Sequence, residues 1–256
     1  MEPRVSALKS RFTPERVRCV ARTSFVRATP NGAPASQLLR GECFDIGARR
    51  GEWLDGVCSH DGYSGFVLAR DFTPDPRIPN WVVTARSALV FADASIKSAL
   101  VEHLPLGSQL FGREHDAVFL AVDHGFAHRR HVDLIGRELR SPLFWAERLL
   151  GTPYLWAGRS ADGIDCSGLV QLSLGMANVA APRDSGPQRA LGREVASDRL
   201  KGGDLVFVPG HVGIMVDGSR IVHANAHWMT VVVEPLEDML MRLPQGTQML
   251  ARRLEI

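Results

Sequence analysis

One cysteine stands where a helix is expected to begin, and that position suits a nucleophile. Cys166 follows a loop rich in Gly and Asp at 158–165, and the apolar residues after it recur at helical spacing. In the first turn of a helix, free backbone N–H groups and the positive end of the dipole favour thiolate over thiol. The sequence therefore predicts that Cys166 has a lowered pKa, attacks carbonyl carbons and supplies one N–H of an oxyanion hole. A small buried core residue is the alternative.

A nucleophilic thiolate needs a base, and the sequence after residue 202 supplies two histidines within predicted strands. Pro-Gly and Asp-Gly pairs mark the turns between these strands. If a three-residue loop joins the last two strands, Val216 faces Arg220. In that register, the residue numbers of any two residues that face each other add up to 436. The strands expected here are 205–208, 212–216 and 221–224.

In this register the two histidines share one face of the hairpin. We expect His211 to act as the base toward Cys166, and His223 to bind the far ring nitrogen of His211 as the third member of a triad. A slip of one residue would put the two rings on opposite faces. A pair of structural core histidines is the alternative.

Other elements must position these residues. Short apolar runs between Gly, Asn and Asp turns predict a small β-barrel, and a second β-rich unit follows a stiff linker with three prolines at 73–80. Ser141 as N-cap and Pro142 at the first helical position predict a helix that ends at Gly151 and opens the last domain. The strands expected in the two β units are 18–21, 37–39, 43–46, 53–57 and 65–69, then 82–83, 88–91, 109–111 and 117–122.

Together these segments carry a family resemblance. The Pro-Tyr-Leu-Trp turn at 153–156, the Asp-Cys-Ser-Gly motif at 165–168 and the segment from Gly-Asp-Leu to His-Val-Gly at 203–213 resemble the NlpC/P60 family of cell-wall cysteine peptidases. His223 matches the third catalytic position of that family. Ala157 departs from the pattern, because the family usually has a glycine there, and we expect the effect of its added methyl group to be mild.

The resemblance implies a fold and a division of the chain. The fold is α+β: a papain-like catalytic domain, in which a helix bearing the cysteine packs on an antiparallel sheet bearing the histidines, follows two small SH3-like β-barrels. The implied units are an N-terminal segment at 1–16, SH3-like domains at 17–78 and 79–138, and the peptidase domain at 139–256.

The resemblance extends to a substrate pocket. An Arg-Asp-Ser motif at 183–185 matches members that cleave small peptidoglycan peptides, in which its acidic residue binds an N-terminal α-ammonium together with a Glu and a Tyr of an SH3-like domain. The matching residues here are Asp184, Glu42 and Tyr63. A capping role for Asp184, packing for Tyr63 and a solvated turn for Glu42 are the alternatives. The resemblance also assigns to this pocket Tyr154, Trp156, Asp165, Ser167 and Ser185.

The implied activity is hydrolysis of the bond between γ-D-glutamate and a diamino acid. The substrates would be peptidoglycan-derived tri- or tetrapeptides with a free N-terminal L-alanine. The product would be L-Ala-γ-D-Glu, and the reaction would serve murein peptide recycling. A noncatalytic peptidoglycan-binding module, an amidase or endopeptidase on the intact wall, and a thiol acyltransferase on lipid are the alternatives. The sequence does not distinguish diaminopimelate from lysine at the third substrate position. It does not indicate the oligomeric state either.

Composition and motifs argue against other classes. The net charge is +2 and the charges are scattered, so nucleic acid is not an expected partner. No phosphate-binding loop implies a nucleotide cofactor, and His124, His128 and His131 read as a solvated turn rather than a metal site. No apolar run reaches membrane-spanning length, and the first residues lack the apolar stretch of a signal peptide, so we expect a cytoplasmic protein without cofactor, metal or membrane partner.

Overall fold

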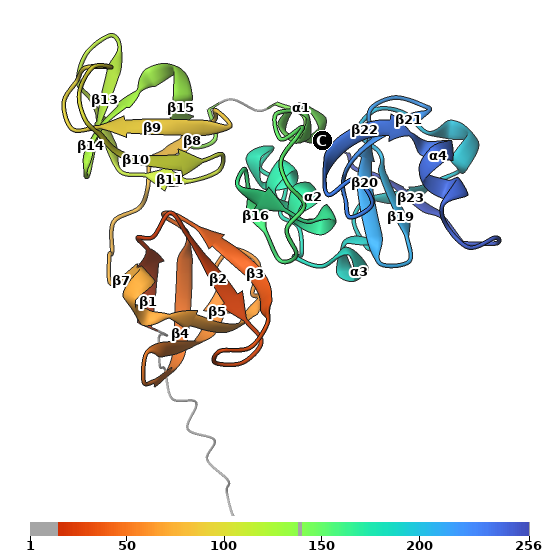
Figure 1. The fold of residues 1–256 in the computed structure, drawn as a ribbon, viewed down its shortest axis with the longest axis horizontal. Coiled ribbons are helices and arrows are strands. Elements are labelled where there is room, and N and C mark those ends of the chain that lie inside the picture. The colour runs from red at the N-terminus through yellow and green to blue at the C-terminus, as the bar shows by residue number, and fades with distance from the viewer. Residues whose placement is uncertain (1–14, 138–139, 256) are drawn as a thin grey trace, which may run out of the picture.

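The computed structural model describes residues 15–137 and 140–255, which form two small β units and a larger α+β domain (Figure 1). The expectation that a signal peptide is lacking concerns residues outside this range, as do residues 1–14 of the expected N-terminal segment. Glu15 and Arg16, the last residues of that segment, already belong to the first strand. Within the described residues, no helix is long and apolar enough to cross a membrane.

The first β unit is a seven-stranded antiparallel sheet in the order β3-β2-β6-β5-β4-β1-β7. Side chains from different strands, such as Val17, Phe44 and Val67, pack together in one shared core, as a barrel requires. The expected strands are found with shifted ends, but two strands were missed: β2, which contains only two apolar residues, and β7, which is only two residues long. The strands are β1 (Glu15–Cys19), β2 (Thr23–Arg27), β3 (Pro34–Leu39), β4 (Cys43–Arg50), β5 (Trp53–Cys58), β6 (Ser64–Leu68) and β7 (Phe72–Thr73).

The second β unit has a five-stranded sheet, β10-β9-β14-β13-β12, and a three-stranded sheet, β11-β8-β15. Four of its strands were not expected: β10, β12, β14 and β15. The expectation of a solvated turn is wrong for His128, which ends β14 and accepts a hydrogen bond from the N–H of Arg130. The strands are β8 (Trp81–Val83), β9 (Ser87–Phe91), β10 (Leu100–Pro105), β11 (Gln109–Leu110), β12 (Gly112–Glu114), β13 (Phe119–Val122), β14 (Gly125–His128) and β15 (Val132–Leu134).

The third domain packs helix α2 (Cys166–Met176) against an antiparallel sheet with the order β18-β23-β19-β20-β21-β22. Its remaining helices are α1 (Pro142–Glu147), with Ser141 as the expected N-cap, α3 (Ser185–Gln188) and α4 (Leu236–Met241). Its strands are β16 (Arg159–Ser160), β17 (Gly163–Ile164), β18 (Arg193–Val195), β19 (Leu205–Val208), β20 (His211–Met215), β21 (Arg220–Asn225), β22 (Thr230–Pro235) and β23 (Leu250–Arg253).

Both faces of the six-stranded sheet are covered, which explains why its central strands read as continuous apolar runs. Leu205 and Phe207 of β19 pack in the core that contains α2, and Val206 and Val208 pack in the core that contains α4. Complete burial of each large apolar side chain stabilises the fold by about 1.5–3 kcal/mol. The sheet and α2 therefore form a rigid support for residues at their ends.

The three domains meet around α2, which lies between the barrels and the sheet (Figure 1). The N–H of Gln109 in the second unit donates to the carbonyl of Arg40 in the first at 2.8 Å, and Arg86 of the second unit donates to the carbonyl of Leu150 at 2.7 Å. Gly107 lies at the meeting point with φ of +88°, and a Cβ there would be 2.7 Å from Leu172 of α2. Only glycine fits this joint.

Candidate active site

Helix α2 begins at Cys166, as the sequence predicts, because Asp165 caps its first turn. Asp165 Oδ1 accepts the N–H of Gly168 at 2.7 Å. A side chain at position 168 would clash, since a Cβ there would lie 2.3 Å from the carbonyl oxygen of Gly158. The Asp-Cys-Ser-Gly motif thus holds the loop against the helix and fixes Cys166 at the helix N-terminus.

The prediction of a lowered pKa for Cys166 is wrong. The side chain is buried, and burial, followed by the charge of Asp165, raises the pKa of the thiol above its ordinary value. The nearby backbone N–H groups of Val212 and Ser167 favour the thiolate and oppose this change in pKa, but burial outweighs them. Val212 directly follows His211, so the strand that carries the expected base lies against the nucleophile.

The two histidines lie on one face, in the predicted register. Strand β20 pairs with β21 through Ile214 with Val222 and Met215 with Ile221, whose numbers sum to 436. His211 Nε2 and His223 Nδ1 are 2.8 Å apart. Burial, then the neighbouring charge of His223, lowers the pKa of His211 to about 4. His211 is therefore a neutral imidazole at neutral pH, with its Nδ1 left for a further partner.

Beyond the second histidine lies a residue that the sequence reasoning missed. Glu234 Oε1 on β22 is 2.8 Å from His223 Nε2. Its carboxylate also accepts from Trp228 Nε1 at 3.1 Å and from Asn225 Nδ2 at 3.2 Å, and forms an ion pair with Arg242. A signal was available, because His223 faces Val232, and Glu234 lies two residues further on the same face.

Asp165 and Ser167, which the resemblance assigns to the substrate pocket, are occupied inside the protein. Arg183, only 2% exposed, forms a double contact with Asp165, from Nη2 to Oδ2 at 2.6 Å and from Nη1 to Oδ1 at 2.9 Å. The same Nη1 donates to Ser167 Oγ at 2.9 Å. Asp165 Oδ2 further accepts the N–H of Ala157 at 2.9 Å. These side chains therefore position Cys166 and have no free carboxylate or hydroxyl for substrate.

Three residues on the other side of the cysteine form a turn. Tyr154 lies close enough to Cys166 that burial, then the charges of Cys166 and Asp165, raise the pKa of its phenol to about 12. Trp156 is 67% exposed and free to contact a ligand. Ala157 is buried with φ of +66°, a left-handed conformation that explains the family's glycine at this position.

Tyr63 and Asp184, from different domains, come together in a cavity. Burial, then the nearby charge of Asp184, raises the pKa of the Tyr63 phenol, and both residues line the same cavity. Asp184 precedes α3 but its side chain makes no capping hydrogen bond, so the alternative of a helix cap is wrong. Ser185 is the half-buried first residue of α3. Residues lining the cavity come from the first barrel and from the segment before α3: Ala28, Ala35, Asp61–Ser64, Pro182–Asp184 and Pro187.

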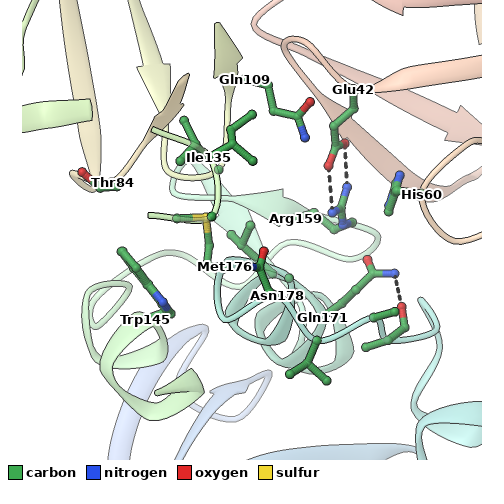
Figure 2. Close-up of a pocket in the computed structure, with 18 of the residues that line it drawn as sticks. Glu42, His60, Thr84, Gln109, Ile135, Trp145, Arg159, Gln171, Met176 and Asn178 are labelled. Carbon is green, nitrogen blue, oxygen red and sulfur yellow. Dashed lines mark hydrogen bonds and ion pairs between the residues drawn. The ribbon is translucent and has the colours of Figure 1, made fainter. Parts of the chain in front are cut away.

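Glu42 does not join this pair, contrary to the prediction. It is 8% exposed and forms a double contact with Arg159 across the domain boundary, at 2.9 and 3.1 Å (Figure 2). Burial opposes its charge, but Arg159 holds the pKa of Glu42 below its ordinary value. Glu42 lines a separate cavity of about 280 Å³ at the junction of the three domains, which includes neither Cys166 nor Asp184 in its lining.

Comparisons with known proteins match two parts of the chain. Residues 151–244 match the NlpC/P60 family, and residues 26–72 match the bacterial dipeptidyl-peptidase SH3 domain. A crystal structure of an NlpC/P60 family protein from Bacillus cereus superposes with a TM-score of 0.78 at 19% identity, covering 93% of this chain and 99% of that one. This likeness shows that the three-domain fold is shared.

Curated relatives cover most of the chain. A γ-D-glutamyl-L-lysine dipeptidyl-peptidase from Bacillus cereus is 24% identical over 241 residues, covering 78% of this chain and 70% of that protein. A protein of the same name from Bacillus subtilis is 27% identical, covering 74% and 71%. Dipeptidyl-peptidase 6 from Lysinibacillus sphaericus is 29% identical, covering 69% and 74%.

Proposed function

Since the chain is a cysteine-type peptidase with an NlpC/P60 domain and a bacterial SH3 domain, we propose that it hydrolyses the γ-D-glutamyl bond to the diamino acid in short peptidoglycan peptides. Its substrates are tri- and tetrapeptides with a free N-terminal L-alanine, and its product is L-Ala-γ-D-Glu. The observation that carries this choice is the exposed Asp184 carboxylate, which makes no capping hydrogen bond and lines one cavity together with Tyr63 of the first barrel.

The catalytic step is acyl transfer. Cys166 Sγ attacks the γ-carbonyl carbon while its proton passes to Nδ1 of His211, which gives it to the leaving amine. Water, deprotonated by His211, then hydrolyses the thioester and restores the thiol. The raised pKa of Cys166 and lowered pKa of His211 support a neutral resting pair, in which the proton moves during attack. The backbone N–H of Cys166 and the protonated phenol of Tyr154 are suited to hold the oxyanion.

The Tyr63–Asp184 pair supports recognition of an amino terminus. Asp184 is an exposed carboxylate with no arginine or lysine in contact with it among the described ion pairs, so its charge is available for an ammonium group. Asp61 lines the same cavity, but its side chain is only 2% exposed and its oxygens accept from Gln171 Nε2 and from the N–H of Tyr63, so Asp184 is the carboxylate available to a ligand. The first barrel forms one wall of this cavity, so an alanine acylated by glycan would lose the ion pair and meet the barrel wall. This favours released peptides, as a recycling step requires, over the intact wall.

The test is product analysis by mass spectrometry. We expect free L-Ala-γ-D-Glu-L-lysine or its diaminopimelate analogue to yield L-Ala-γ-D-Glu, and Cys166→Ala to abolish the reaction while the protein stays folded. Both diamino acids belong in the assay, since two relatives are named for lysine. Absence of cleavage by the folded wild-type protein, with binding to isolated peptidoglycan, would replace the proposal by a binding module.

A further inference from the structure

Four ring nitrogens belong to the two histidines, and three of them have partners in the described residues. His211 Nε2 meets His223 Nδ1 at 2.8 Å, and His223 Nε2 meets Glu234 Oε1 at 2.8 Å. His223 is fully buried, so water does not compete for these contacts. Nδ1 of His211 is thus the one of these four nitrogens without a partner among the described residues, and Val212, the next residue along the strand, lies close to Cys166.

Glu234 is held as an ionised carboxylate. Burial opposes its charge, but hydrogen bonds from Arg242 and Trp228, together with His223, hold the pKa of Glu234 below its ordinary value. The amide nitrogen of Asn225 is a further donor to Oε1 at 3.2 Å, and its contact with Nε2 of His223 is longer, at 3.3 Å. Arg242, Trp228 and Asn225 present only N–H groups to Glu234, and an ionised carboxylate can only accept.

The direction of each hydrogen bond follows from this acceptor. A carboxylate at Glu234 requires the proton of neutral His223 to lie on Nε2, which leaves Nδ1 of His223 with a lone pair. That lone pair can only accept, so the proton of His211 must lie on Nε2. We infer that Glu234 is a positioning residue for catalysis, which fixes the tautomers of both histidines and leaves Nδ1 of His211 as the base.

The same carboxylate also acts when the proton moves. As the thiol of Cys166 is deprotonated, His211 gains a positive charge, and the negative charge of Glu234 beyond His223 stabilises it. The groups that face Glu234 are the titratable His223 from β21 and the charged Arg242 after α4, while Trp228 and Asn225 are neutral donors. The inference rests on the proposed acyl transfer where kcat is measured. The measurement of the histidine tautomers does not depend on the proposed reaction.

The discriminating variant is Glu234→Gln. Both oxygens of Glu234 accept N–H groups. The amide nitrogen that replaces one of these oxygens must therefore either face another N–H group, or donate to His223 and reverse the tautomers of both histidines. We expect kcat to fall about 10–100-fold with little change in KM, because the base becomes protonated in part of the molecules. The exposed glutamate of strand β18 in the same sheet gives the matched control Glu194→Gln, which should leave kcat unchanged.

Nitrogen-15 NMR of the histidine rings in the wild-type protein tests the tautomers directly. This measurement needs neither an activity assay nor a folded variant. In the wild-type protein at neutral pH we expect protonated Nε2 and unprotonated Nδ1 on both His211 and His223, and in Glu234→Gln a mixture or reversal. A proton on Nδ1 of His211 in the wild type would overturn the inference. So would a Glu234→Gln variant with wild-type kcat or wild-type tautomers, since a merely structural glutamate would change only the free energy of unfolding.

Discussion

The substrate site that we propose has two halves, a catalytic half and an amine-binding half, and they are built in different ways. The catalytic half comes from one domain: the first turn of α2 and the neighbouring strands β20 and β21 carry Cys166, His211 and His223. The amine-binding half forms between domains, from Tyr63 in a loop of the first barrel and Asp184 before α3. On this proposal, catalytic geometry depends on one packed core, and specificity depends on how the barrel docks.

Each half is supported by a buried pair of an arginine and a carboxylate. Arg183 and Asp165 hold the nucleophile loop inside the catalytic domain, and both side chains are less than a tenth exposed. Arg159 and Glu42 join the catalytic domain to the first barrel, where Arg159 also donates to the carbonyl of Gln37 at 2.7 Å. The first pair supports chemistry and the second supports the domain arrangement, and variants can separate these roles.

The largest expected loss is for Arg183→Met. This change leaves Asp165 buried without its cation, and breaking a buried pair in this way costs roughly 3–5 kcal/mol of unfolding free energy. Urea denaturation measures the loss. Arg220→Met, at an exposed ion pair with Asp217, is the control and should leave the midpoint unchanged. Equal stability of the Arg183 variant and the wild type would show that the pair does not hold the loop.

Glu42→Gln sharpens the comparison at the domain boundary. The amide can still accept from Arg159 but loses the charge, so we expect a smaller loss of unfolding free energy, about 1–3 kcal/mol. Because Glu42 is outside the Tyr63–Asp184 cavity, the preference for free over N-acetylated peptide should stay at its wild-type value. Competition between the two peptides measures this preference. Loss of the preference for free peptide in a folded variant would show that Glu42 takes part in binding the amine.

The neutral resting state of the catalytic half can be tested by pH. Because burial raises the pKa of Cys166, its thiolate fraction should still be rising beyond the ordinary thiol pKa of about 8.5. The iodoacetamide alkylation rate between pH 5 and 10 measures that fraction, and Cys166→Ala gives the background from the other three thiols. A plateau of fast alkylation already at pH 6 would instead demonstrate a preformed thiolate–imidazolium pair.

The smallest expected effect is a gain of stability for Ala157→Gly. The left-handed conformation at φ of +66° costs an L-residue about 1 kcal/mol, which glycine avoids in the folded state. Thermal unfolding should show the gain. Ala177→Gly, at φ of −94°, is the control and should show none. A less stable Ala157→Gly variant would mean that the methyl group packs usefully enough to offset its strain.

Local patterns predicted the catalytic half well, since short-range rules fix it. The Asp-Gly turn sets the register of β20 and β21, and the N–H of Val216 bonds to the carbonyl of Arg220 at 2.7 Å as expected. Glu234 escaped notice because it follows three valines in a run that reads only as a strand. The thiol pKa was predicted in the wrong direction because burial depends on the whole core rather than on the helix end.

The amine-binding half was harder because its partners are far apart in the sequence. Glu42 fits a motif, but its charge is compensated by Arg159, 117 residues away. Asp165 and Ser167 fit the nucleophile motif, but Arg183 from another loop occupies both. Sequence spacing shows which residue types are present, and tertiary contacts decide which of them still have a free polar group for substrate.

The most direct test of the account is the ratio of kcat/KM for free and N-acetylated L-Ala-γ-D-Glu-diamino acid, in the wild type and in Asp184→Asn. We predict a strong preference for the free peptide and a fall of about 10–100-fold for it in the variant, because a hydrogen bond to a charged group contributes roughly 1.5–3 kcal/mol. Asp198→Asn, at an exposed aspartate, should change neither value. Equal cleavage of both peptides by the wild type, or an unchanged ratio in Asp184→Asn, would contradict an amine-reading pocket.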